Sequence, residues 1–488
     1  MSETSAGSRA IGGTLRIFLA EALILPTGLV TAGFLTRRLG AADYGMLALA
    51  TTVVTWLEWC ISSLFARATF KLVAEAEDWR PAGSTVVWLS GVTGMLVALL
   101  LCLLAAPLSE LLHQPGLVAY LRLFSLDIPF FALAQAHRNI LVGIGEYRHR
   151  AIATAWRWLS RMALIMLLVG AGLSVTGAIL GSIGASLVEL GASRYYVRPP
   201  VRRPPYAMRA LWDYAVPLFA AGVAARLLDK LDLFMLSALG GGSVQAGQYG
   251  AAQNLSVVPG LFALSLSSLL LSALSRSLGE RDMTSAQDLA RNALRVSLLL
   301  LPYGAMTAGA SVAIVSAIFG SSFAPAGPAL ALLIFAALAV LIISVASAIL
   351  IAAGRPRWVA RIALPLPALA LAADLVAIPR WGMRGAAGVT LLAALCGAAA
   401  ALGSVHVLWR VHPSAASLAR SVAVSIGVYL VAQWWGASGP LLALELLAIG
   451  AAIPAAYLVL GELDERERNV VFSALRQDAH RTTLRSEP

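Results

Sequence analysis

Long apolar runs alternate with short charged segments along almost the whole chain. A bilayer core of about 30 Å requires roughly 20 apolar residues of a crossing helix, so each run predicts a membrane span. Lipid offers no hydrogen-bond partner to the backbone, which leaves helices as the structure of such runs. The predicted spans are fourteen: 14–36, 44–65, 83–106, 117–142, 150–170, 174–195, 211–239, 246–274, 288–319, 326–352, 358–378, 385–408, 417–436 and 440–460.

Short motifs occur twice, in the same order and about 200 residues apart. The pairs are Leu39-Gly40 with Leu239-Gly240, Tyr44-Gly45 with Tyr249-Gly250, residues 140–148 with 349–357, and Gly177-Ala178 with Gly385-Ala386. Duplicated halves are a common construction of membrane transporters, with the substrate path where the halves face each other. The repeat therefore favours a carrier.

The repeat and the loops together predict an all-α polytopic membrane protein with two parallel-related six-helix lobes around a central cavity. The segment 198–210 is basic and rich in proline, which keeps a connector extended. We therefore expect a first lobe at 1–197, this cytoplasmic connector, a second lobe at 211–410, two additional helices at 411–460 and a charged cytoplasmic tail at 461–488.

Composition agrees with a membrane protein, because 59% of the residues are hydrophobic and only 12% are charged. The net charge of +11 does not indicate nucleic acid, since the arginines lie in short loops between spans. One side of the predicted membrane holds most of them, whereas the other holds Arg37, Arg38, Arg380 and Arg384. Cytoplasmic loops carry the excess of positive residues, so both termini are predicted to be cytoplasmic.

The sequence contains no nucleotide-phosphate loop, no paired carboxylates in a glycosidase pattern and no histidines at metal-ligand spacing. Cys60, Cys102 and Cys396 lie far apart inside apolar runs and are interpreted as small buried hydrophobes. These observations predict no cofactor, no resident metal and no enzyme activity.

Four segments carry a resemblance to a known family. They are residues 35–45 (LTRRLGAADYG), the series from Asp232 through Gly247 to Ala252, residues 353–357 (AGRPR) and residues 381–387 (WGMRGAA). Together they resemble the polysaccharide, Wzx-like or O-antigen, flippases of the multidrug/oligosaccharidyl-lipid/polysaccharide exporter superfamily, over about residues 10 to 460. The first two spans carry no convincing copy of the lipid II flippase signatures.

The resemblance implies a flippase of the bacterial cytoplasmic (inner) membrane. It would translocate a polyprenyl-pyrophosphate-linked oligosaccharide, such as an O-antigen or exopolysaccharide repeat unit, by rocking two lobes in an ion-coupled cycle. The implied partners are the lipid-linked oligosaccharide, the bilayer, and polysaccharide polymerase and assembly proteins.

Basic residues inside predicted spans are candidates for binding the pyrophosphate, because charge inside a membrane is costly unless it faces a cavity. Span seven carries Arg226 and Lys230 on one arc of a helix, and span five carries Arg157 and Arg161 one turn apart. Arg138 of span four is a further candidate. The alternatives are an internal ion pair of Arg226 with Asp229 and, for the other three arginines, interfacial positions at the cytoplasmic side.

Carboxylates inside spans are candidates for ion coupling or charge pairing. The candidate residues are Asp229, Glu21, Asp127 and Glu58. The alternative is that the carboxylates of the first lobe, Glu189 included, neutralise its arginines. Asp374 and Glu445 are expected near outer ends of spans as surface groups.

Two other function classes stay open. A multidrug or cation antiporter of the same superfamily is favoured by the carboxylates but not by the cationic residues, since its substrates are cations. A membrane-embedded glycan polymerase is a less favoured alternative, because the predicted outer loops are short and hold few acid or base residues.

Overall fold

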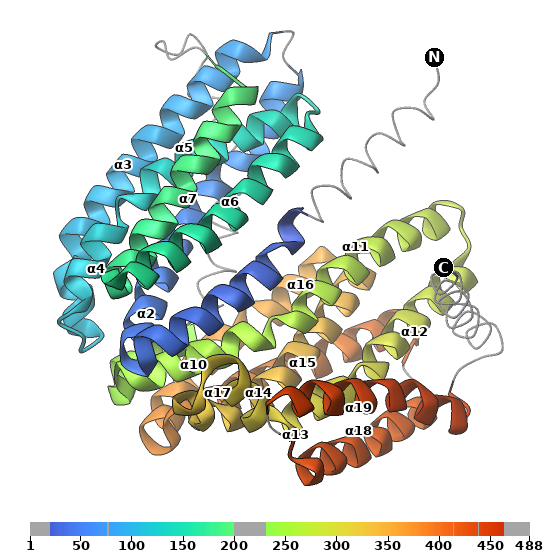
Figure 1. Ribbon diagram of the computed structural model, residues 1–488. Coiled ribbons are helices and arrows are strands. Elements are labelled where there is room, and N and C mark those ends of the chain that lie inside the picture. Colours follow the sequence, from blue (N-terminus) through green and yellow to red (C-terminus); the bar gives the residue numbers. More distant parts are fainter. Residues whose placement is uncertain (1–19, 76–77, 200–230, 413, 438, 463–488) are drawn as a thin grey trace, which may run out of the picture. The chain divides into compact units, whose positions relative to one another are not determined.

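The computed structural model describes residues 20–75, 78–199, 231–412, 414–437 and 439–462 (Figure 1). These residues form helices joined by short turns, as predicted for an all-α polytopic membrane protein. The elements are α2 (Ile24–Glu75), α3 (Trp79–Leu111), α4 (Leu117–Phe124), α5 (Asp127–Gly143), α6 (Tyr147–Leu168), η1 (Val169–Leu173), α7 (Ser174–Tyr196), α9 (Leu231–Leu236), η2 (Ser237–Gly241), α10 (Gly242–Ser256), α11 (Val258–Gly279), α12 (Met283–Leu299), α13 (Leu301–Gly309), α14 (Ser311–Phe319), η3 (Ser321–Ala326), α15 (Gly327–Ala352), α16 (Pro356–Ala363), α17 (Pro365–Trp409), α18 (Ala415–Trp435) and α19 (Pro440–Val459).

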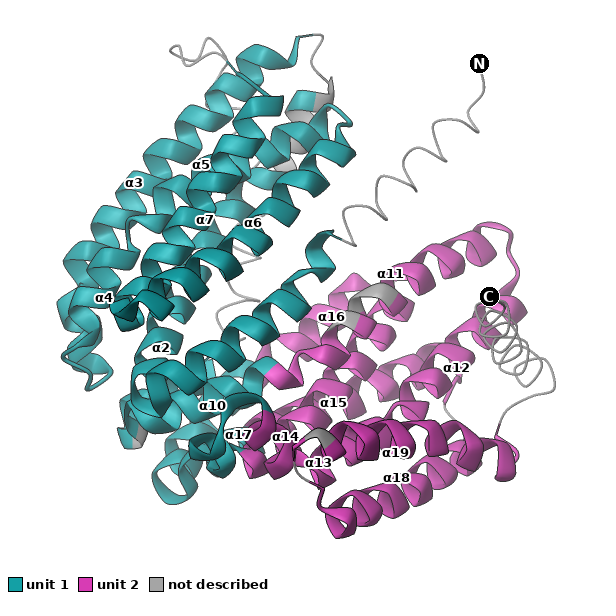
Figure 2. Ribbon diagram, in the orientation of Figure 1, with its two compact units in different colours: residues 1–254, 318–326, 367–389 teal, residues 255–317, 327–366, 390–488 magenta. Residues whose placement is uncertain are grey.

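Packing divides the chain into two compact units (Figure 2). The first unit contains residues 1–254, 318–326 and 367–389, and the second contains the rest. The first unit thus combines α2 to α7 with α9, α10, η3 and the first part of α17. This division describes packing, so the lobe boundaries inferred from the repeat stay a prediction.

Three helical runs are too long for a single membrane crossing. They are Ala20–Ala66, Tyr147–Tyr196 and Pro356–Trp409, with 47, 50 and 54 residues. Each is interrupted by a glycine with positive φ: Gly40 at 74°, Gly172 at 95° and Gly382 at 52°. Glycine reaches this region without steric cost, so each run turns at the glycine and holds two of the predicted spans.

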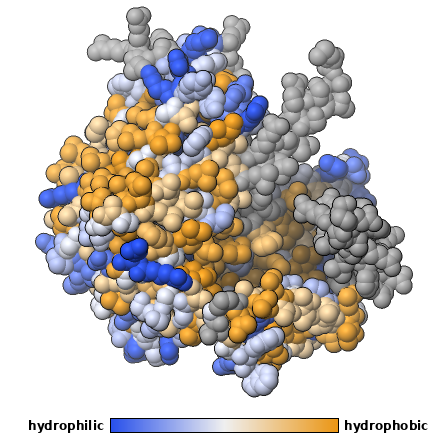
Figure 3. Space-filling view, viewed as in Figure 1, coloured by the Kyte–Doolittle hydropathy of each residue, from blue (hydrophilic) through white to orange (hydrophobic). Residues whose placement is uncertain are grey.

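Within the described ranges, eight helical runs are long and apolar enough to cross a membrane, or nine if a bent pair counts as one span. The bent pair is Met283–Gly309 with Ser311–Phe319, at 66°. Because most of predicted span seven lies outside the described residues, the number fourteen stays a prediction. Apolar residues cover much of the surface seen in Figure 3, as a lipid-facing surface requires.

The duplicated motifs form the same turn at both copies. In the first, Gly145 has φ of 80° and the amide of Glu146 donates to the carbonyl of Leu141. In the second, Gly354 has φ of 73° and the amide of Arg355 donates to Leu350. Each is a helix end closed by a left-handed glycine, which explains why glycine recurs there.

Glu462 follows α19, and its side chain bonds to residues of two other helices in the second unit, α12 and α18. Its carboxylate accepts hydrogen bonds from Arg295 of α12 at 2.9 Å and Arg420 of α18 at 2.8 Å, and from the Ser417 hydroxyl. Burial alone would raise the pKa of Glu462, but the bonds from Ser417, Arg420 and Arg295 outweigh it and hold the pKa below its usual value. Glu462 therefore ties the two C-terminal helices to α12.

We predict that Glu462→Ala destabilises the second unit. The substitution leaves Arg295 partly buried without its carboxylate, which costs about 1–3 kcal/mol. The melting temperature of the purified protein in detergent should fall. Because the folded-state pKa is lowered, the contribution of Glu462 is complete above the ordinary carboxyl pKa of about 4.3 and is lost as pH falls through the lower folded value.

Asp288→Asn is the matched control, since Asp288 also pairs with an arginine, Arg291, but on the exposed surface. Exposed ion pairs contribute little, so this variant should melt like the wild type. An equal loss in both variants would contradict the account of Glu462.

Candidate functional site

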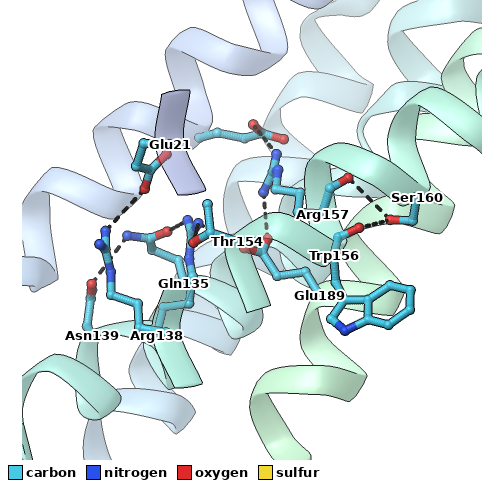
Figure 4. Close-up of polar contacts among 11 residues, drawn as sticks. Glu21, Gln135, Arg138, Asn139, Thr154, Trp156, Arg157, Ser160 and Glu189 are labelled. Carbon is cyan, nitrogen blue, oxygen red and sulfur yellow. Dashed lines mark hydrogen bonds and ion pairs between the residues drawn. The ribbon is translucent and has the colours of Figure 1, made fainter. Parts of the chain in front are cut away.

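The first unit holds a group of charged side chains inside its helices, which we call the arginine cluster. Its members come from four helices: Glu58 of α2, Asp127 and Arg138 of α5, Arg157 and Arg161 of α6, and Glu189 of α7. Figure 4 shows how the side chains of Arg138, Arg157 and Glu189 turn toward one another between the helices. The sequence places them far apart, and helix packing brings them together.

Glu189 is the centre of the arginine cluster and is 0% exposed. Its two oxygens lie 2.8 Å from Nη1 of Arg138 and 2.8 Å from Nη1 of Arg157 (Figure 4). Arg157 also lies 3.8 Å from Glu58. The alternative in which first-lobe carboxylates neutralise arginines is therefore realised for Arg138 and Arg157.

Arg138 is buried, so the expectation of an interfacial position is wrong. Its guanidinium also contacts Gln135 and lies 3.5 Å from the hydroxyl of Thr154. Arg157 is buried as well, with its guanidinium over the ring of Phe131 at 4.5 Å. These aromatic and carboxylate contacts replace the water that a guanidinium loses on burial.

Arg161 differs from its neighbours. It lies one turn beyond Arg157 on α6 and is half-buried. Within the described part of the chain it forms no hydrogen bond or ion pair, although it interacts electrostatically with Glu58 and Asp127. The described residues therefore leave its five donors without a hydrogen-bond acceptor.

Two further carboxylates sit beside the arginines. Asp127 is buried at the start of α5, and Pro129 lies in the first turn of the same helix. Asp127 interacts electrostatically with Glu58. Glu21 lies at the edge, 42% exposed, and pairs with Arg150 at 3.3 Å.

The candidates of predicted span seven, Arg226, Asp229 and Lys230, lie outside the described residues. Asp232, just beyond them, belongs to a second polar group; the sequence marked Asp232 as part of the family resemblance but not as a candidate site residue. Tyr249 of α10 donates a hydrogen bond to Asp232 at 2.6 Å, and the amide of Gln253 lies 3.0 Å from each carboxylate oxygen.

Asp374 of α17 interacts electrostatically with Asp232, and we call these two residues the aspartate pair. Asp374 is 2% exposed and its Oδ1 has no hydrogen-bond partner among the described residues. The expectation of surface positions is thus wrong for Asp374, and also for Glu445, which is 1% exposed and accepts from the amide of Ala437. Both sit in apolar runs, and a one-dimensional pattern does not show which helix faces are covered.

The fold and the intramembrane charges define a polytopic membrane transporter rather than an enzyme. A family model described as polysaccharide biosynthesis protein matches residues 11–276, more than half of the 488 residues. The chain therefore belongs to the polysaccharide biosynthesis protein family, a flippase family. No curated protein matches the chain.

Solved structures share this fold at low sequence identity. The lipid II flippase MurJ in an inward closed conformation superposes with a TM-score of 0.76 at 15% identity, covering 94% of this chain and 100% of that one. An inward-facing multidrug resistance MATE family transporter of the MOP superfamily gives 0.69 at 14% identity, covering 83% and 96%. A MOP superfamily transporter from Pyrococcus furiosus, described by a binding pocket of reverse polarity, gives 0.59 at 13%, covering 85% and 96%.

We predict that Glu189→Gln destabilises the first unit strongly. The change removes the carboxylate from two buried arginines at once, and breaking a buried pair costs about 3–5 kcal/mol. Thermal unfolding in detergent and the amount of protein in the membrane should both report the loss.

Glu21→Gln is the control, because Glu21 makes one ion pair at a half-exposed position. It should change stability by less than about 1 kcal/mol. Equal stability of the Glu189→Gln variant and the wild type would show that Glu189 does not hold the arginine cluster together.

Proposed function

We propose that this protein translocates a polyprenyl-pyrophosphate-linked oligosaccharide across the bacterial cytoplasmic membrane, with both termini in the cytoplasm. The observation that carries the proposal is Arg161, an arginine inside a membrane helix whose donors are not used by the described residues. Membership of a polysaccharide biosynthesis family supports the glycan part of the substrate.

A pyrophosphate needs charge-assisted donors at the depth where it crosses the apolar region. Guanidinium groups supply such donors in a planar fork that matches phosphate oxygens. Arg161 provides the first contact, and Arg157, one turn away, keeps Glu58 and Glu189 at its side when the substrate is absent. Arg226 and Lys230, from the sequence, are proposed as the contribution of the second lobe.

The substrate must also leave Arg161 after it has crossed, and the arginine cluster contains carboxylates that favour this release. Glu58 and Asp127 act electrostatically on Arg161, so they compete with the substrate for its charge. Arg138 is proposed to act through Glu189 rather than by direct contact, because its guanidinium is buried and already paired.

Ion coupling is proposed at carboxylates. The aspartate pair is the strongest candidate, since two acidic groups that interact inside a membrane gain most from a bound cation or proton. Asp127 with Glu58 is a second candidate, and Asp229 and Glu21 stay as predicted from the sequence. Polysaccharide polymerase and assembly proteins are proposed as partners that receive the product.

A multidrug or cation antiporter is the second candidate, favoured by the MATE-like fold and the aspartate pair. The arginine cluster argues against it, because a cationic drug is repelled by Arg161. The Pyrococcus furiosus transporter illustrates that pocket polarity varies on this fold.

The function is tested in a deletion strain of the native host. Loss of a surface glycan together with accumulation of a complete lipid-linked repeat unit is the expected result. An unchanged glycan combined with greater sensitivity to cationic dyes would favour the antiporter instead.

We predict that Arg161→Ala abolishes complementation of that strain while the protein still inserts, and that Arg161→Lys retains part of it. Lysine keeps the charge but loses the bidentate fork. Transport is measured as release of the accumulated lipid-linked oligosaccharide, and membrane abundance is measured in parallel.

Arg148→Ala is the matched control, since it removes one exposed arginine from the beginning of the same helix. It should complement like the wild type. Full complementation by Arg161→Ala would remove Arg161 from the substrate path.

A further inference from the structure

Arg150 lies in the first turn of α6, at the end of the helix where the arginine cluster reaches the surface. Its Nη2 pairs with Oε1 of Glu21 at 3.3 Å, and Glu21 belongs to the helical run Ala20–Ala66 that continues into α2. The Arg150 side chain is 18% exposed and the Glu21 side chain 42%. This ion pair is therefore open to an anion that arrives from outside the helices.

The same face of α6 carries Arg150 and the arginines of the cluster. Four polar residues follow one another at spacings of four, three and four, which makes them neighbours along one side of a helix. They are Arg150, Thr154, Arg157 and Arg161. Trp156 and Leu159, on the other side of the helix, are exposed as a lipid-facing surface requires.

Arg150 is linked to the cluster by charge as well as by position. It interacts electrostatically with Arg138 and Glu189. Eleven residues separate it from Arg161, which is about 16 Å along a helix that rises 1.5 Å per residue. That is about half of a bilayer core of roughly 30 Å, so an anion that moves along this face from the end of α6 meets Arg150 before Arg161.

Arg150 is already paired, so an incoming anion has to displace a carboxylate. Glu58, Asp127 and Glu189, the carboxylates of the arginine cluster, are buried, whereas Glu21 is partly exposed. A carboxylate that turns into water recovers its hydration, and one that stays buried without its partner does not. Glu21 is therefore the carboxylate of this group that an anion can displace at the least cost.

We infer that Arg150 is the first contact of the pyrophosphate on its way to Arg161, and that Glu21 is the counter-ion that the pyrophosphate displaces. The inference rests on the proposed function and deepens it, because it assigns the entry step. A pyrophosphate brings more charge and more oxygen acceptors to the guanidinium fork than one carboxylate does, which favours the exchange. Of the two roles that the sequence left open for Glu21, ion coupling and charge pairing, this is the second.

The test is a double-mutant cycle of Glu21→Gln and Arg150→Gln in the full-length protein, purified in detergent. The probe is farnesyl pyrophosphate, a short polyprenyl pyrophosphate without a glycan. Its Kd is measured by isothermal titration calorimetry for the wild type, both single variants and the double variant. Farnesol, the same tail without phosphates, reports binding of the tail alone.

Arg150→Gln should weaken binding of farnesyl pyrophosphate about tenfold, because a charged hydrogen-bond donor is lost. Glu21→Gln should tighten it about two- to fivefold, since the competing ion pair is partly exposed and weak. The double variant should bind like Arg150→Gln, because Glu21 acts through Arg150. Farnesol should bind all four proteins alike.

Each variant has a matched control at the same end of α6. Arg148→Gln removes an exposed arginine two residues from Arg150, off the polar face of the helix. Glu146→Gln removes a carboxylate that is 51% exposed and pairs with His149 instead of an arginine. Both controls should bind farnesyl pyrophosphate like the wild type.

An Arg150→Gln variant that binds farnesyl pyrophosphate like the wild type would overturn the inference, and so would a wild type that does not bind it. Tightening by Glu21→Gln to the same extent with and without Arg150 would also overturn it, because Glu21 would then act by general repulsion. Tighter binding cannot result from misfolding, so Glu21→Gln keeps the test decisive even if Arg150→Gln fails to fold.

The cycle uses no glycan, so its failure leaves the proposed function to the deletion strain and to Arg161→Ala. Conversely, an unchanged surface glycan in the deletion strain, with binding that depends on Arg150, would overturn the proposed function and leave Arg150 as an anion contact.

Discussion

The ion pairs of Glu189 with Arg138 and Arg157 are the constraint on which the first unit depends. Charge inside a membrane protein is costly unless each group finds a partner or faces water. The helices α2, α5, α6 and α7 meet around these pairs. Each contributes a charged side chain, and the apolar side chains of the same helix offer that charge no partner. The pairing fixes the register of α5, α6 and α7 against one another. It also leaves Arg161 as the cation that the described residues do not neutralise by contact.

Motifs that occur twice in the sequence form the same local structure at both copies. The same left-handed glycine turn ends a helix at Gly145 and at Gly354, and the same motif appears at Gly40 and Gly240. Such turns let one continuous helical run fold back across the membrane without a long loop. Close to the two copies of the motif, α2 and α10 pack backbone to backbone at Gly45 and Gly247. Glycine at positions 45 and 247 has a steric reason, because a Cβ atom on either residue would collide with the backbone of the facing helix.

Much of the fold could be predicted because a helix that crosses the lipid bilayer needs a long run of apolar residues. Predicted spans 326–352 and 440–460 match α15 and α19 within one residue at each end, since nothing but apolar length decides them. The partners and the burial of the carboxylates were harder to predict from the sequence. Glu189 was foreseen as a possible partner of the arginines, but the choice among Arg138, Arg157 and Arg161 depends on helix rotation. Asp374 was placed at the surface because hydropathy does not reveal which helix covers it.

The central claim is that Arg161, an arginine inside the membrane whose donors the described residues do not use, binds an anionic lipid-linked glycan. It is tested most directly by translocation in proteoliposomes that contain the purified protein. One set carries a polyprenyl-pyrophosphate-linked oligosaccharide, scored by its exposure to an impermeant lectin, and the other a fluorescent cationic drug. The account predicts that the protein moves the oligosaccharide across the bilayer and does not move the drug. Movement of the drug without the oligosaccharide would contradict it.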